Sequence, residues 1–143
     1  MLKKPVLTLE RERFAPYGAI LDFSPGYTGF FEVLVSESGH PWRLAVYRDN
    51  RRASTFLENH PDSMETFEPV RGVALLLVAI PQRPEDFDVF LLDRPVCLHK
   101  GIWHDVVALS DDLLIRVTEN LEVESVFHTF EAPYRPLLCQ GEA

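Results

Sequence analysis

Two stretches of the sequence combine histidine and carboxylate side chains at spacings that could build one site, Glu58–Gly72 and His99–His104. In the first, His60 ends a strand-like run and Glu65 follows a turn, so their side chains can meet across a hairpin. In the second, a glycine permits the close turn that brings His104 onto a strand facing the same pocket. These groups could bind a divalent metal ion, with the candidate ligands His60, Glu65, His104 and Glu58. They could equally form a metal-free acid–base set, and the residue types leave both possibilities open.

The elements that must position these residues are nearly all β-strands. Short apolar runs separated by Pro, Gly, Asn and Asp recur about every ten residues, which is typical of a sandwich or closed barrel. Glu10–Tyr17 is expected to form one or two helical turns, and Val73–Ile80 is apolar on both faces and therefore predicts a central strand. The candidate strands are Ala19–Phe23, Gly29–Val35, Trp42–Arg48, Ser54–Asn59, Met64–Val70, Val73–Ile80, Val89–Leu92, Trp103–Leu109, Leu113–Glu119 and Val123–His128. The pattern predicts an all-β antiparallel barrel with a short N-terminal helical segment.

Length and composition restrict the class of protein. The 143 residues suit a single domain, 1–143, with one core. The net charge of −8 argues against a nucleic-acid partner, since phosphate binding needs a basic surface. No apolar run reaches the length of a membrane span and the first residues do not resemble a signal peptide, so a cytoplasmic protein is expected. Cys97 and Cys139 match no zinc spacing and are expected to be reduced thiols.

The two chemistry-bearing stretches resemble the two sequence motifs of cupins. In the first motif, HxHx(3,4)Ex(6)G, Glu58 stands where the first His would be, and His60 with the Glu and Gly that follow it fits the spacing. In the second motif, PxGxxH, the glycine and His104 fit, and His99 replaces the proline. The resemblance implies a cupin-type jelly roll.

The chain is also similar to the ureidoglycolate lyase (ureidoglycolate hydrolase) family, whose members adopt a cupin fold. Leu57–Pro61 resembles the family's L-E-R-H-P, Glu65–Pro69 resembles Q-x-F-x-P, and His99–His104 resembles H-R-x-x-W-H. Phe14–Gly18 and Val123–Ser125 resemble the family's opening and ending.

The chain departs from that family at several places. The segment between Phe23 and Trp42 is shorter, and Asp105 stands where the family has a second His. The family's Asp-Arg pair is missing near Val117 and Thr118. The resemblance is therefore to a diverged and shortened member, and specificity, which rests on polar groups around the substrate, is the property these changes affect most.

The resemblance implies a carbon–nitrogen lyase that cleaves ureidoglycolate to glyoxylate and urea, or acts on a related small hydroxy or carbonyl acid. The implied catalytic residues are His60, Glu65 and His104, and a divalent metal ion is the one cofactor that these residues could bind. The implied contacts to the small anionic substrate are Arg48, Lys100, His99 and Trp103, although a Trp in this position is more often a core residue. Arg48 and Arg116 lie in apolar strands, so each needs a partner or a substrate anion.

Two further expectations concern assembly and the rival class of function. Small barrels leave edge strands that need cover, which predicts a homodimer. Because fold does not determine function, the alternative to an enzyme is a non-catalytic ligand- or metal-binding cupin. The shortened early segment and the missing polar pair favour this alternative.

Overall fold

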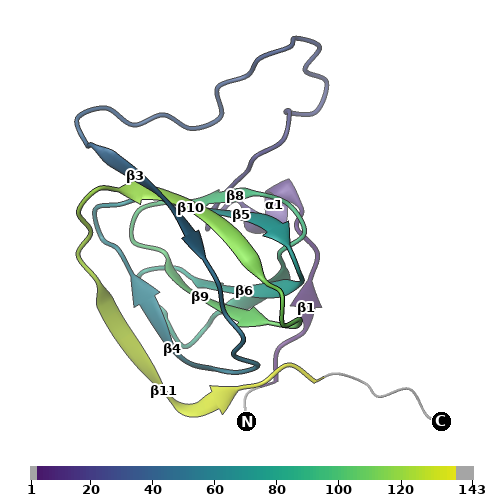
Figure 1. Ribbon diagram of the computed structural model, residues 1–143, viewed down its shortest axis with the longest axis vertical. Coiled ribbons are helices and arrows are strands. Elements are labelled where there is room, and N and C mark those ends of the chain that lie inside the picture. The colour runs from purple at the N-terminus through teal and green to yellow at the C-terminus, as the bar shows by residue number, and fades with distance from the viewer. Residues whose placement is uncertain (1–2, 138–143) are drawn as a thin grey trace, which may run out of the picture.

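The computed structural model describes residues 3–137, whose strands form two sheets packed as a β-sandwich (Figure 1). The six-stranded sheet contains, in spatial order, β1 (Val6–Leu7), β7 (Asp88–Leu91), β6 (Ala74–Ala79), β9 (Trp103–Ala108), β4 (Ser54–Asn59) and β11 (Val126–Tyr134). The five-stranded sheet contains β2 (Gly18–Ile20), β8 (Val96–Leu98), β5 (Glu65–Arg71), β10 (Leu114–Asn120) and β3 (Trp42–Tyr47). All neighbouring strands are antiparallel except β1 and β7, which pair in parallel.

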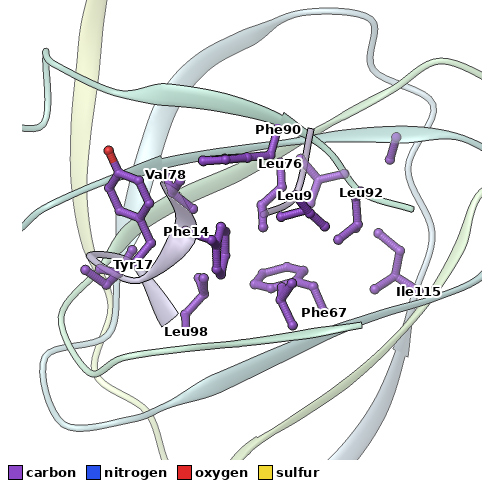
Figure 2. Close-up of a cluster of buried hydrophobic side chains, with 14 of the residues drawn as sticks. Leu9, Phe14, Tyr17, Phe67, Leu76, Val78, Phe90, Leu92, Leu98 and Ile115 are labelled. Atoms are coloured by element: carbon purple, nitrogen blue, oxygen red, sulfur yellow. The ribbon is translucent and has the colours of Figure 1, made fainter. Parts of the chain in front are cut away.

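The main hydrophobic core lies between the two sheets (Figure 2). Leu76, Val78 and Phe90 come from the six-stranded sheet, and Phe67, Leu98 and Ile115 come from the five-stranded sheet. The N-terminal segment adds Phe14, which has no exposed surface and meets the ring of Phe90 edge-on with the ring centroids 5.1 Å apart. Burial of a phenylalanine of this kind stabilises the fold by roughly 2 kcal/mol.

The expected helical segment over Glu10–Tyr17 reduces to a single turn, α1 (Arg11–Phe14). Pro16 lacks the N–H group that a continuing helix would need, so the turn ends before it. No helix within residues 3–137 has the length and apolar character needed to cross a membrane.

The prediction that Val73–Ile80 holds a central strand is confirmed by β6. All six of its residues are buried, and it pairs with β7 on one side and β9 on the other. On its second face, Leu75 and Leu77 belong to another apolar cluster together with Phe87, Phe130 and Tyr134. Because both faces are covered, the apolar run shows no alternation.

The predicted strand over Gly29–Val35 is wrong, since these residues form no strand and stand away from both sheets (Figure 1). The pattern has the right residue types, but a strand also needs a hydrogen-bonded neighbour, which its own chain does not supply. Two short strands were missed, β1 and β8, because two or three residues are too few to show a period. The last strand begins later than expected, at Val126, and continues to Tyr134.

Candidate active site

Two rows of polar side chains face one another between the sheets at one end of the core. On the five-stranded sheet, Glu119 of β10 is the cross-strand partner of Arg43 on β3 and of Glu65 on β5. On the six-stranded sheet, Glu58 of β4 is the partner of His104 on β9. Together with His60, which follows β4 directly, these residues line one cavity of about 260 Å³.

The two imidazole rings are oriented by backbone carbonyl groups. Nδ1 of His104 lies 2.9 Å from the carbonyl oxygen of Ile102, and Nδ1 of His60 lies 3.0 Å from that of Glu124. A carbonyl oxygen can only accept, so each Nδ1 carries a proton and donates it. Each Nε2 is therefore left to face the cavity, and the ring centroids lie 5.2 Å apart.

Carboxylate oxygens surround both Nε2 atoms. Nε2 of His60 lies 3.1 Å from Glu58, 3.4 Å from Glu65 and 3.9 Å from Glu119. Nε2 of His104 lies 2.8 Å from the same Oε2 atom of Glu65, which nevertheless makes no well-aligned hydrogen bond. A bare nitrogen lone pair would be repelled by these carboxylates, so they favour a proton or another cation at the Nε2 atoms.

The charge of Glu65 controls the protonation of His104. Complete burial alone would lower the pKa of His104, but the negative charge of Glu65 outweighs burial and raises that pKa to about 9. Burial would raise the pKa of Glu65, but the charges of His104 and His60 hold it below its ordinary value. At neutral pH, in the absence of a metal ion, the two residues form an imidazolium–carboxylate pair.

Arg43 is the one basic side chain other than histidine that lines the cavity among the described residues. Its Nε and Nη2 atoms both donate to Oε2 of Glu119, at 2.9 Å and 2.5 Å. The arginine side chain is 44% exposed, whereas that of Glu119 is only 8% exposed. Arg43 therefore joins a buried carboxylate to the open mouth of the cavity, where an anion could reach it.

A buried ion network supports the floor of the cavity. Arg51 bonds Asp105 at 2.8 Å and Asp49 at 2.6 Å, and Ser54 donates to Asp105 at 2.6 Å. Bonds to Asp105 and Asp49 raise the pKa of Arg51 above its ordinary value. Because Asp105 directly follows His104 on β9, the network holds the strand that carries this imidazole. Arg51 thus bridges strand β9 and the loop that follows β3.

The structure brings together His60, Glu65, His104 and Glu58, as their spacing predicted. The four residues assigned to substrate contact lie outside the cavity lining. His99 bonds the carbonyl oxygen of Ala15 at 3.1 Å, and Lys100 pairs with Glu37 at 2.6 Å. Trp103 donates to the carbonyl oxygen of Pro81 and packs against the second apolar cluster, as the core interpretation expected.

The two strand arginines behave differently from one another. Arg48 follows β3 and is exposed, so it needs no buried partner. Arg116 has the partner that its strand position required, because it bonds Glu68 at 2.6 Å on the outer face of the sheet. Cys97 is buried and forms no disulfide among the described residues, and Cys139 lies outside them.

Sequence reasoning missed two charged residues of the cavity, Arg43 and Glu119. The signal was present in the strand periodicity. Arg43 lies on the same strand face as Ala45 and Tyr47, and Glu119 lies on the same face as Ile115 and Val117, which belong to the core. A charged residue on the inward face of an apolar strand requires a buried partner. The pairing of β3 with β10, which makes these two residues partners, is a long-range contact that the strand patterns do not specify.

The cavity contains two overlapping sets of donors that could hold a metal ion. The first is Glu58, His60 and His104, and the second is His60, Glu65 and Glu119, with the ligand atoms of each set within 4.8 Å of one another. Carbonyl bonds to both Nδ1 atoms are the supporting contacts that metal-binding histidines usually have. The unsatisfied Oε2 atom of Glu65, between two Nε2 atoms, also fits a bound cation.

Comparison with known proteins identifies a relative over most of the chain. No family model matches the chain. The protein named ureidoglycolate lyase from Azotobacter vinelandii (strain DJ / ATCC BAA-1303) is 32% identical over 127 aligned residues, which cover 73% of this chain and 76% of the relative. Similarity of this extent shows the family of the chain. The chain belongs to the ureidoglycolate lyase family.

Proposed function

We propose that this protein cleaves ureidoglycolate to glyoxylate and urea. One observation carries the proposal: two imidazole Nε2 atoms, a buried carboxylate and an arginine converge on one small cavity. The name of the Azotobacter vinelandii relative supports the same reaction. The requirements of the substrate can be compared with these groups one at a time.

The substrate is a carbinolamide in which one carbon carries a hydroxyl group, a carboxylate and the ureido nitrogen. Cleavage removes the hydroxyl proton, and the O–H electron pair forms the carbonyl group of glyoxylate. The C–N bond breaks with its electrons on nitrogen, which takes up a proton as urea leaves. The site must therefore supply a base, an acid and a cation for the carboxylate.

The two histidines are suited to the two proton transfers. His104 carries a proton at neutral pH because Glu65 raises its pKa to about 9, so it can protonate the departing nitrogen. In its neutral form, His60 presents the lone pair of Nε2 and can accept the hydroxyl proton. Glu58, 3.1 Å from that nitrogen and hydrogen-bonded by Ser125, stabilises the imidazolium that results.

The same donors also fit a divalent cation, held either by Glu58, His60 and His104 or by His60, Glu65 and Glu119. Three carboxylates and Arg43 leave the cavity with a net negative charge. Protons on both Nε2 atoms or one divalent cation would neutralise that charge equally well. When bound, such a cation would polarise the hydroxyl oxygen of the substrate. With a cation on His60, Glu65 and Glu119, Glu58 would remain free to accept the hydroxyl proton.

The β-sandwich itself is proposed to be a cupin-type jelly roll. His60 follows β4, Glu65 begins β5, and His104 lies on β9, so the residues of the two cupin-like motifs meet in one cavity between the sheets. Gly72 has φ of 80° at the turn between β5 and β6, a conformation that favours glycine and explains its place in the motif.

Arg43 is the proposed binding group for the substrate carboxylate, and its replacement tests the substrate class. We expect Arg43→Gln to lower kcat/KM for ureidoglycolate about thirtyfold, mostly through KM, because a charge-assisted bond worth about 2 kcal/mol is lost. Steady-state kinetics of glyoxylate release measure this change. Inhibition by glycolate, which keeps the hydroxyl and carboxylate groups, should weaken by a similar factor.

The matched control for Arg43→Gln is Arg83→Gln, since Arg83 is 66% exposed in a turn outside the cavity. This control should keep the kinetic constants of the wild type. If Arg43→Gln retains kcat/KM within threefold of wild type, Arg43 does not bind the carboxylate.

A further inference from the structure

The two stretches that carry His60 and His104 are joined by a pair of hydrogen bonds at Gly101, in the turn between β8 and β9. The N–H group of Gly101 donates to the carbonyl oxygen of His60 at 3.0 Å. The carbonyl oxygen of Gly101 accepts from Nδ2 of Asn59 at 2.6 Å. Both backbone groups of one glycine are therefore bound to the end of β4.

This link lies one residue away from the group that orients His104. Ile102, which follows Gly101, accepts the hydrogen bond from Nδ1 of His104 at 2.9 Å. A series of bonded groups thus runs from His60 through Gly101 and Ile102 to the imidazole of His104. The separation of the two rings, whose centroids lie 5.2 Å apart, depends on this series.

Asn59 makes its part of the link from outside the cavity. It shares a strand face with Leu57, which belongs to the second apolar cluster, whereas Glu58 faces the cavity. Asn59 is buried, uncharged and not part of the cavity lining. It can therefore affect the chemistry of the site only through the residues that it holds in place.

The second polar atom of the Asn59 amide reduces what this residue adds to stability. Oδ1 is buried and receives no hydrogen bond from the described residues. An unpaired buried acceptor destabilises a fold, so it offsets the gain from the bond that Nδ2 makes to Gly101. In the family's L-E-R-H-P motif, Arg stands where this chain has Asn59, so the link departs from that motif.

We propose that Asn59 is a positioning residue of the candidate active site, which sets the separation of the two imidazole rings by holding Gly101. Its effect on catalysis rests on the proposed lyase reaction, whereas its effect on ring position does not. Removal of the hydroxyl proton and protonation of the leaving nitrogen need the two Nε2 atoms at a fixed separation. Without the bond to Asn59, the turn before β9 shifts and His104 moves with it.

Asn59→Leu tests the link, because leucine has the same branched shape and lacks both polar atoms. We expect kcat for glyoxylate release to fall about tenfold to a hundredfold, since a misplacement of about 1 Å has an effect of this size. KM should stay within about threefold of wild type, because Arg43, the proposed carboxylate-binding group, lies on the other sheet. The midpoint of guanidinium unfolding should stay close to wild type, because the unpaired Oδ1 is removed together with the donor.

The matched control is His99→Leu, which breaks a different bond of the same turn. Nε2 of His99 bonds the carbonyl oxygen of Ala15 at 3.1 Å, and His99 makes no hydrogen bond to Asn59 or His60 within residues 3–137. This variant should keep the kcat of wild type. A loss of kcat in His99→Leu as large as in Asn59→Leu would overturn the proposal, because any change in the turn would then suffice.

Gly101→Ala disturbs the same link from its other side and decides the question if Asn59→Leu does not fold. Gly101 has φ of 79°, which alanine rarely adopts, and the nearest atom that an added Cβ would meet is Cγ of Pro81 at 3.6 Å. The turn should therefore shift without a clash. We expect a loss of kcat like that of Asn59→Leu, and a double variant no worse than either single variant, since both break one link.

Nuclear magnetic resonance of the histidine side chains, at neutral pH with a chelator and without substrate, measures the geometry directly. The wild type should show a slowly exchanging Nδ1 proton on His104, which Asn59→Leu loses and His99→Leu keeps. An unchanged Nδ1 proton or a wild-type kcat in Asn59→Leu would overturn the proposal. If the chain releases no glyoxylate but shows the expected loss of this proton, the proposed reaction fails and Asn59 remains a positioning residue.

Discussion

Replacing His104 with alanine is expected to lower kcat for ureidoglycolate cleavage about a thousandfold. Glu65 raises the pKa of His104 to about 9, and Nε2 of His104 lies 2.8 Å from Glu65 within the cavity. The variant removes the group that protonates the leaving nitrogen or, in the metal-bound state, a ligand. A positioned acid contributes about 10² to 10⁴ to the rate, which sets the expected size of the loss.

The measurement is glyoxylate release at saturating substrate, with His128→Ala as the matched control. His128 lies outside the cavity and pairs with Glu85 at the surface, so its removal should not change kcat. A His104→Ala variant that is folded and keeps activity within threefold of wild type would show that the site is elsewhere.

The ion pair between Glu65 and His104 should also make the stability of the metal-free protein depend on pH. The folded pKa of His104 is about 9, above its ordinary value of 6.5. The folded state thus binds the proton more tightly, so the stabilisation is complete below pH 6.5 and is lost as the pH rises through about 9. We expect the free energy of unfolding to fall by roughly 3 kcal/mol across this window.

Guanidinium unfolding in the presence of a chelator, at intervals from pH 6 to about 9.5, measures this dependence. Glu65→Gln removes the charge that raises the pKa of His104, so its stability should change little over the same range. Glu85→Gln, which removes a carboxylate beside a surface histidine, should behave as wild type. Wild-type and Glu65→Gln curves of equal slope would contradict the assigned pair.

The part of the site that was predictable from the sequence is the part fixed by local spacing. His60 and Glu65 are joined by one hairpin, and a short turn before His104 places it at the start of β9. The apolar run of β6 likewise predicted its own burial. In each case, the periodicity of a strand and the length of a turn determine where the side chain lies.

The rest depended on contacts between distant segments. Arg43 and Glu119 meet only because β3 pairs with β10, and Arg51 meets Asp105 across two strands and a loop. Gly29–Val35 has the residues of a strand, and the pattern cannot tell whether a neighbour exists within the same chain. Strand composition therefore predicted the elements better than it predicted their partners.

The most direct test of the central claim is glyoxylate release from racemic ureidoglycolate by the purified chain, measured against the spontaneous reaction. One arm contains a chelator and the other contains added Mn²⁺, Ni²⁺ or Zn²⁺. Release above the spontaneous rate is the expected result, and the arm in which it occurs tells whether the Nε2 atoms of His60 and His104 carry protons or hold a cation. A folded protein that releases no glyoxylate in either arm would contradict the proposed lyase and leave a ligand-binding member of the family.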